Sequence, residues 1–85
     1  MTRLTMTQKA LVREAAQRHM TDVTLVRVGQ LWGVVGREEG GRKWTGLLVS
    51  DVDTKGRVWW ISTPVGPFTT RLRTVSALKS RAEEI

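Results

Sequence analysis

From Val23 to Thr74 the chain consists of short runs rich in apolar and β-branched residues, and each run is bounded by a polar segment containing glycine or proline. Such runs are typical of short antiparallel strands joined by tight turns. The predicted strands lie near residues 23–28, 31–36, 43–51, 57–63 and 68–74. A flat sheet of five such strands would expose its edges and half of its apolar side chains, and closure removes both problems. The sequence therefore predicts a small five-stranded antiparallel barrel over residues 23–74.

The segments that flank this region have helical spacing instead. In residues 5–20 apolar side chains recur every three or four positions, and the N-cap is either Thr7 or Thr5, the latter in a capping box with Gln8. Residues 75–84 repeat the helical pattern over a shorter length. The expected fold class is α+β and mostly β, with an N-terminal helix, a barrel and a short closing helix.

Length and composition limit both the core and the chemistry. With 85 residues the chain makes a single domain, residues 1–85, close to the smallest size at which a hydrophobic core suffices. There is no cysteine, so neither a disulfide nor a thiolate metal site can form, and a reducing compartment is the simplest expectation. The sequence contains neither the apolar run of a signal peptide nor the roughly 20 apolar residues that span a bilayer. We expect a soluble, cytoplasmic protein with no membrane partner.

The charge of the chain favours anionic partners. The formal net charge is +6, and most of the excess lies in residues 27–74, where basic residues outnumber acidic ones. Arginine predominates over lysine, which is also the ordinary composition of proteins from GC-rich genomes. Charge therefore indicates a class of partner without identifying it.

Two adjacent tryptophans, Trp59 and Trp60, lie in one predicted strand, where neighbouring residues point to opposite faces. The DTKG segment between the third and fourth strands is typical of a hairpin turn, with Gly56 at a positive-φ position. In that hairpin Val52 lies opposite Val58, and Trp60 follows Val58 on the same face. Trp60 is therefore expected in the core, and Trp59 on the outer face.

The outer face around Trp59 is the main predicted binding surface. On the last predicted strand, Arg71 and Arg73 turn toward the same side as Arg57 and Trp59. An indole among three arginines suits single-stranded nucleic acid, because bases stack on aromatic faces and guanidinium groups hold phosphates. It also suits a protein interface, where Trp and Arg dominate the binding energy. Alternatively, the N-terminal helix covers Trp59 and the residue is structural.

A polar, glycine-rich loop extends this predicted surface. The segment GREEGGRK leads into Trp44, and Arg42 and Lys43 come directly before that tryptophan. Trp44 either stacks on a base or a peptide, or closes the mouth of the barrel. Trp32 shares the face of Val34 and is expected in the core.

The residue inventory contains no pattern typical of an active site. His19 lies on a helix face beside alanine and methionine, without the partners that a metal or an acid–base role needs. Thr69, Thr70 and Ser76 lack a matching histidine and aspartate. We therefore expect no enzyme activity, no cofactor, no metal and no small-molecule substrate.

Three segments carry a resemblance to a known group of proteins. They are VGQLW (28–32), VSDVDTKGRVWW (49–60) and TTRLRTVSAL (69–78), with a glycine- and arginine-rich loop after the first. Over residues 26–75 the chain resembles short, mostly uncharacterised proteins of actinobacteria and their phages, which are similar in outline to small β-barrels of the Tudor and KOW kind. This resemblance implies a barrel that binds nucleic acid or a protein segment, and it brings no catalytic residues.

These observations lead to one expected function and one alternative. The expected function is a non-enzymatic, nucleic-acid-binding small barrel of a phage or an actinobacterium, with a regulatory or accessory role. The alternative is a protein interaction module that docks on a host protein and modulates it through the same face. The predicted binding residues are Arg57, Trp59, Arg71, Arg73, Arg42, Lys43 and Trp44.

Overall fold

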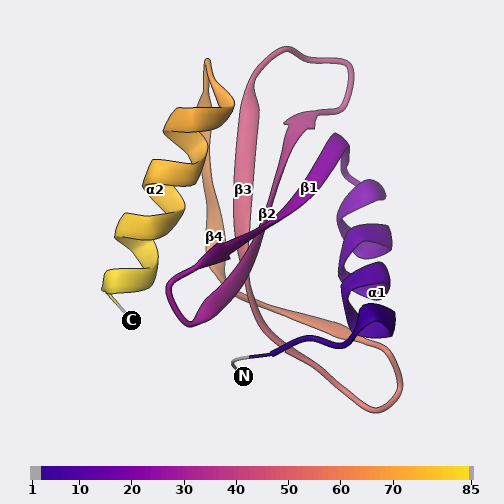
Figure 1. Ribbon diagram of the computed structural model, residues 1–85. Helices are drawn as coiled ribbons and strands as arrows, with labels where there is room; N and C mark the ends of the chain where they lie inside the picture. Colours follow the sequence, from indigo (N-terminus) through magenta and orange to yellow (C-terminus); the bar gives the residue numbers. More distant parts are fainter. Residues whose placement is uncertain (1–2, 85) are drawn as a thin grey trace.

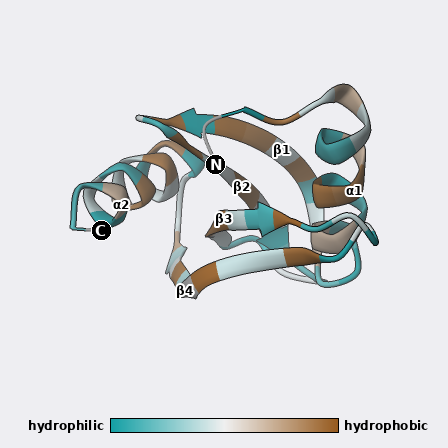
Figure 2. Ribbon diagram, turned by 90° about the horizontal axis from the view of Figure 1, so that it is seen from below, coloured by the Kyte–Doolittle hydropathy of each residue, from teal (hydrophilic) through white to brown (hydrophobic). Residues whose placement is uncertain are grey.

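The computed structural model describes residues 3–84 and consists of an open antiparallel sheet between two helices (Figure 1). The elements are α1 (Met6–Gln17), β1 (Met20–Val28), β2 (Leu31–Glu38), β3 (Trp44–Val52), β4 (Val58–Phe68) and α2 (Arg71–Glu83). The strands pair in sequence order, and α1 and α2 lie on opposite sides of the sheet (Figures 1 and 2). The predicted α+β, mostly β class and the order of helix, sheet and helix are confirmed.

The last predicted strand, residues 68–74, is wrong. β4 ends at Phe68, and α2 begins at Arg71 after Thr70, whose hydroxyl accepts the backbone N–H of Arg73 at 3.2 Å. The short alternation of apolar and polar residues favoured a strand at this point. A threonine N-cap followed by good helix formers outweighs that alternation.

The sheet has four strands and is not closed, where the sequence predicted a five-stranded barrel. β1 and β4 form its two edges. Closure was inferred because the apolar side chains of both faces need cover. In the structure each face is covered by one helix instead, so the sheet buries both faces without joining its edges.

α1 begins at one of its two predicted caps. The Thr5 hydroxyl accepts the backbone N–H of Gln8 at 3.1 Å, and the Gln8 side chain accepts the backbone N–H of Thr5 at 2.9 Å. This reciprocal capping box satisfies two N–H groups that the first turn leaves free. The helix ends at Gln17 rather than at residue 20, because Met20 already starts β1.

The sheet face under α1, here called the α1 face, carries the larger part of the core. Val12 and Ala16 of α1 are buried in one cluster with Val34 and Val49 of the sheet. Trp60 packs against this cluster, as its predicted inward orientation requires. The register of the β3–β4 hairpin, with Val49 opposite Trp60, agrees with that prediction.

The opposite face, here called the α2 face, is built around Leu78. Leu78 and Thr74 of α2 are both fully buried, and the Thr74 hydroxyl donates to the backbone carbonyl of Thr70 at 3.0 Å. Gly46 of β3 lies directly below them: a Cβ at this position would come within 2.9 Å of Leu78 Cδ1. The missing side chain at residue 46 lets α2 seat closely on the sheet.

Candidate nucleic-acid interface

The predicted binding residues separate into two groups at opposite ends of β4. Trp59 is the second residue of this 11-residue strand, whereas Arg71 and Arg73 follow its far end in the first turn of α2. In an extended strand such a separation is roughly 30 Å. The prediction that Arg71 and Arg73 flank Trp59 is therefore wrong, and Arg57 is its remaining predicted neighbour.

Trp59 is 50% exposed, so the prediction of an outer position is confirmed and α1 does not cover it. The Arg57 guanidinium lies 5.7 Å from its ring centroid, and the indole N–H donates to Asp53 at 3.4 Å. Asp53 also forms an ion pair with Arg57 at 2.9 Å. The backbone N–H of Arg57 is the largest of the contacts that hold the pKa of Asp53 below its ordinary value, so this carboxylate stays charged. An arginine already paired with a carboxylate is a poor anchor for phosphate.

Trp44, at the other end of β4, belongs to a row of side chains across the sheet. It begins β3 and lies opposite Arg37 of β2 on one side and Phe68 of β4 on the other. Because Gly46 lies under α2, strand alternation places Trp44 on the α2 face too. The Arg37 guanidinium is 5.9 Å from the Trp44 ring centroid. The row lies where α2 begins, so the helix leaves Trp44 half-buried rather than covered.

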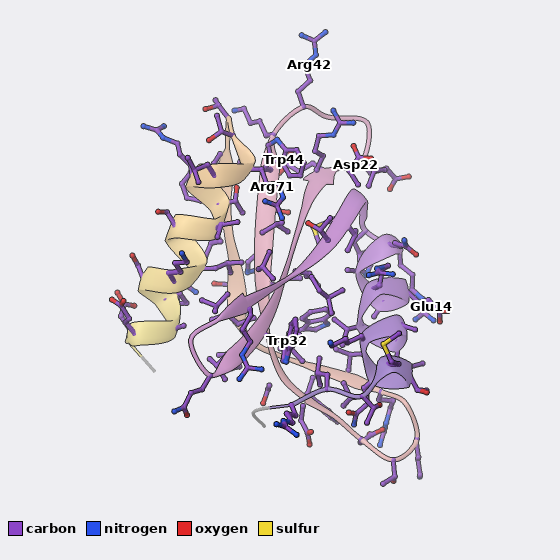
Figure 3. All side chains as sticks on the ribbon, in the orientation of Figure 1. Glu14, Asp22, Trp32, Arg42, Trp44 and Arg71 are labelled. Atoms are coloured by element: carbon purple, nitrogen blue, oxygen red, sulfur yellow. The ribbon has the colours of Figure 1, made fainter. Side chains whose placement is uncertain are left out.

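Arg71 joins this row from above. Its guanidinium donates to the Thr24 hydroxyl of β1 at 3.1 Å, so the side chain reaches from the first turn of α2 across to the far edge strand. Thr24 lies opposite Val35, on the same face as Arg37. Figure 3 shows Arg71 and Trp44 together below the β2–β3 loop, from which Arg42 projects.

The cations at this end of the molecule differ in whether they are paired. Arg37 forms an ion pair with Asp22. Four exposed cations, in contrast, make no ion pair within residues 3–84: Arg42, Lys43, Arg71 and Arg73. Glu38, the last residue of β2, and Glu39 in the loop offset part of this charge. We call the set Arg42, Lys43, Trp44, Arg71 and Arg73 the Trp44 surface.

The remaining two tryptophans pack against the core of the α1 face. Trp60 packs into the core of the α1 face. Trp32 packs against the same core, as predicted, and its ring has the Lys9 ammonium at 4.6 Å and the Arg27 guanidinium at 5.3 Å. The tryptophans that lie outside both core clusters are therefore Trp44 and Trp59.

Sequence reasoning brought Arg42, Lys43 and Trp44 together correctly but missed Arg37. The missed signal was hairpin symmetry: in a β2–β3 hairpin, the residue before the loop lies opposite the residue after it. Arg37, the last but one residue of β2, lies opposite Trp44, the first residue of β3. The contact of Arg71 with β1 joins residues far apart in the chain, and no local pattern signals it.

No helix within residues 3–84 is long and apolar enough to cross a membrane. In the same range no group of three or more His, Cys, Asp and Glu side chains is placed to hold a metal ion. No family model, curated protein or solved structure matches the chain. The side chains described above are therefore the basis for inferring a function.

Proposed function

We propose that the protein is a non-enzymatic module that binds single-stranded nucleic acid through the Trp44 surface. The proposal depends on one observation: four exposed cations without an ion pair in the described chain lie at the end of the molecule where a half-buried indole begins β3, two just before it in the chain and two in the first turn of α2. Phosphates bind such cations and release condensed counterions, while an unstacked base gains contact area on an aromatic ring. A duplex keeps its base faces stacked, so a single strand is the better ligand for Trp44.

The first turn of α2 supports this proposal. Arg71 and Arg73 occupy its first and third positions, and the turn contains no acidic residue. The N-terminus of a helix carries about half a positive charge, so acidic residues there stabilise a helix by about 0.3–1 kcal/mol and cations oppose it. Through the helix dipole, two arginines at this place therefore do not stabilise α2. A phosphate bound near them would turn this repulsion into attraction.

The expected recognition is weak in sequence preference. Stacking on Trp44 and contacts to phosphate report little about which base is present. We further propose a regulatory or accessory role in the cytoplasm of an actinobacterium or its phage, in which a protein of this kind binds many sequences. Specificity would then come from a partner or from the structure of the nucleic acid.

Binding to labelled oligo-dT and oligo-U of about 12 nucleotides, a length typical of small single-strand binders, tests the proposal by fluorescence anisotropy. Between about 50 and 200 mM salt, a plot of log K against log salt concentration should have a slope of about −0.7 for each neutralised phosphate. Arg73→Ala should make that slope shallower by about 0.7. Trp44→Leu should cost about 1–3 kcal/mol at every salt concentration and leave the slope unchanged, because stacking releases no counterions.

Arg13→Ala is the matched control. Arg13 is an exposed arginine of α1, on the other side of the sheet, and its loss changes the net charge by the same amount. Equal effects of Arg13→Ala and Arg73→Ala would reduce the binding to nonspecific charge attraction. A folded wild-type protein that binds neither oligonucleotide at low salt would overturn the proposal.

A further inference from the structure

The outer edge of β4 is open to an additional strand. β4 is the last strand of the sheet, so no described strand pairs with its outer side (Figure 1). Its second half contains Pro64 and Pro67, and prolines obstruct strand pairing. Residues 58–63 contain no proline. An edge of this length without proline is a template for β-pairing.

A groove runs beside this edge on the α1 face. Its volume is ≈ 430 Å³, and it lies between one side of α1 and the first residues of β4. Leu11 and Ala15 of α1 line it from one side and Trp60 from the other. A second hollow of ≈ 370 Å³ also contacts Ala15 and Trp60 and continues as far as Pro67. The two hollows share Ala15, His19 and Trp60 in their linings, so they lie next to each other on the α1 face.

The charge at the groove selects its occupant. Arg18 and Arg57 line the first hollow together with Glu14, and Glu38 lines the second. Arg57 is already paired with Asp53, so Arg18 is the cation of the first hollow that remains for a ligand. Arg18 makes no ion pair in the described part of the chain. A second copy of the chain would bring another net charge of +6 to the same place, whereas an acidic peptide brings the opposite charge.

We propose that β4 and this groove bind an extended acidic segment of a partner protein, which adds to the sheet beside Val58–Thr63 as a fifth strand. Main-chain hydrogen bonds to the free edge would supply affinity, and alternate side chains would supply specificity. One set of side chains would enter the groove against Ala15 and Trp60. The other set would cover Trp59, and this gives the half-exposed indole a role separate from the proposed nucleic-acid interface.

A random peptide library displayed on phage, selected on the immobilised full chain, supplies the probe for a test. We expect enrichment of peptides in which apolar residues alternate with aspartate or glutamate. In fluorescence anisotropy, the Kd of the best peptide should rise roughly tenfold in Arg18→Glu, since the change removes an attraction and adds a repulsion. Arg13→Glu, which makes the same charge change on the same helix outside the groove, should alter Kd by less than about twofold. Methylating alternate backbone nitrogens of the peptide should abolish binding.

Amide hydrogen exchange locates the peptide-binding site on the protein. The amides of residues 58–63 should exchange more slowly in the complex, while those around Trp44 should not change. Equal weakening by Arg18→Glu and Arg13→Glu, protection elsewhere, a helical bound peptide, or a wild-type dimer that protects the same amides would each overturn the proposal. Because Arg18 lies outside the Trp44 surface, Arg18→Glu should still bind oligonucleotides. Failure of one proposal is thus distinguishable from failure of the other.

Discussion

Replacing Gly46 with alanine should push α2 away from the sheet. The new Cβ would lie 2.9 Å from Leu78 Cδ1 and 3.0 Å from Thr74 Cγ2. Both side chains are fully buried, so neither can swing into solvent. Overpacking of this kind costs about 1–3 kcal/mol, while alanine regains about 0.4–1 kcal/mol by restricting the unfolded chain. We expect the free energy of unfolding to fall by about 1–2 kcal/mol.

Leu78→Ala tests whether this contact is the cause. On its own, the loss of a fully buried leucine should lower the free energy of unfolding by about 2–5 kcal/mol. In the double variant the alanine at position 46 no longer meets Leu78, and its close contact with Thr74 remains. The combined loss should therefore be smaller than the sum of the two single losses by about 1 kcal/mol.

Urea unfolding of the four proteins, followed by far-UV circular dichroism, measures this coupling. Gly41→Ala is a suitable control, since Gly41 is exposed and a Cβ there would approach its neighbours no closer than 3.4 Å. This change should alter stability by less than about 0.5 kcal/mol. Strict additivity in the cycle, or a Gly46→Ala protein as stable as the wild type, would mean that α2 does not seat on Gly46.

Two further predictions concern the DTKG turn and β4, the strand that follows it. Trp60→Ala should lower the free energy of unfolding by about 3 kcal/mol, because Trp60 packs into the core. Trp59→Ala should lower it by less than about 1 kcal/mol, because its indole is half exposed. If urea unfolding shows a larger loss of stability in Trp59→Ala than in Trp60→Ala, the strand register is wrong. The backbone N–H of Arg57 is the main contact that holds the pKa of Asp53 below its ordinary value of 3.8. Ionised Asp53 should therefore stabilise the fold fully above about pH 3.8, and this contribution should vanish as the pH falls through the lower pKa of the folded state. Melting temperatures from about pH 5 down to about pH 2 should accordingly fall less steeply in Asp53→Asn than in the wild type, and parallel curves would refute this role.

Local signals in the sequence were sufficient for most of the sheet. The DTKG turn predicted a glycine with positive φ, and Gly56 has φ +82°. That turn sets the register of β3 against β4, so the opposite orientations of Trp59 and Trp60 followed from alternation. The capping box of α1 was visible as a threonine followed three residues later by glutamine. Each of these features depends on residues close together in the chain.

The errors arose where distant contacts decide the structure. Residues 68–74 alternate weakly enough to suit either a strand or the start of a helix, and burial of Leu78 on the sheet favours the helix. Because residues 71–73 belong to a helix that follows β4, Arg71 and Arg73 lie beyond the end of β4 that is far from Trp59. A single error of secondary structure thus divided a predicted site into two, although the orientation of Trp59 toward the outer face was predicted correctly.

The division has a functional consequence that follows from the open sheet. A closed barrel would have placed every cation on one continuous outer surface, whereas two helices on opposite faces leave free surface at the end of the sheet and along its edge. The Trp44 surface lies at the end where α2 begins, and the groove lies along β4 beside α1. Because α2 borders the Trp44 surface and α1 borders the groove, a charge change in α1 can alter the groove without altering the packing beneath the Trp44 surface. The two proposed ligands, a nucleic acid and an extended peptide, therefore have separate sites, and changes at Arg73 and at Arg18 should weaken their binding separately.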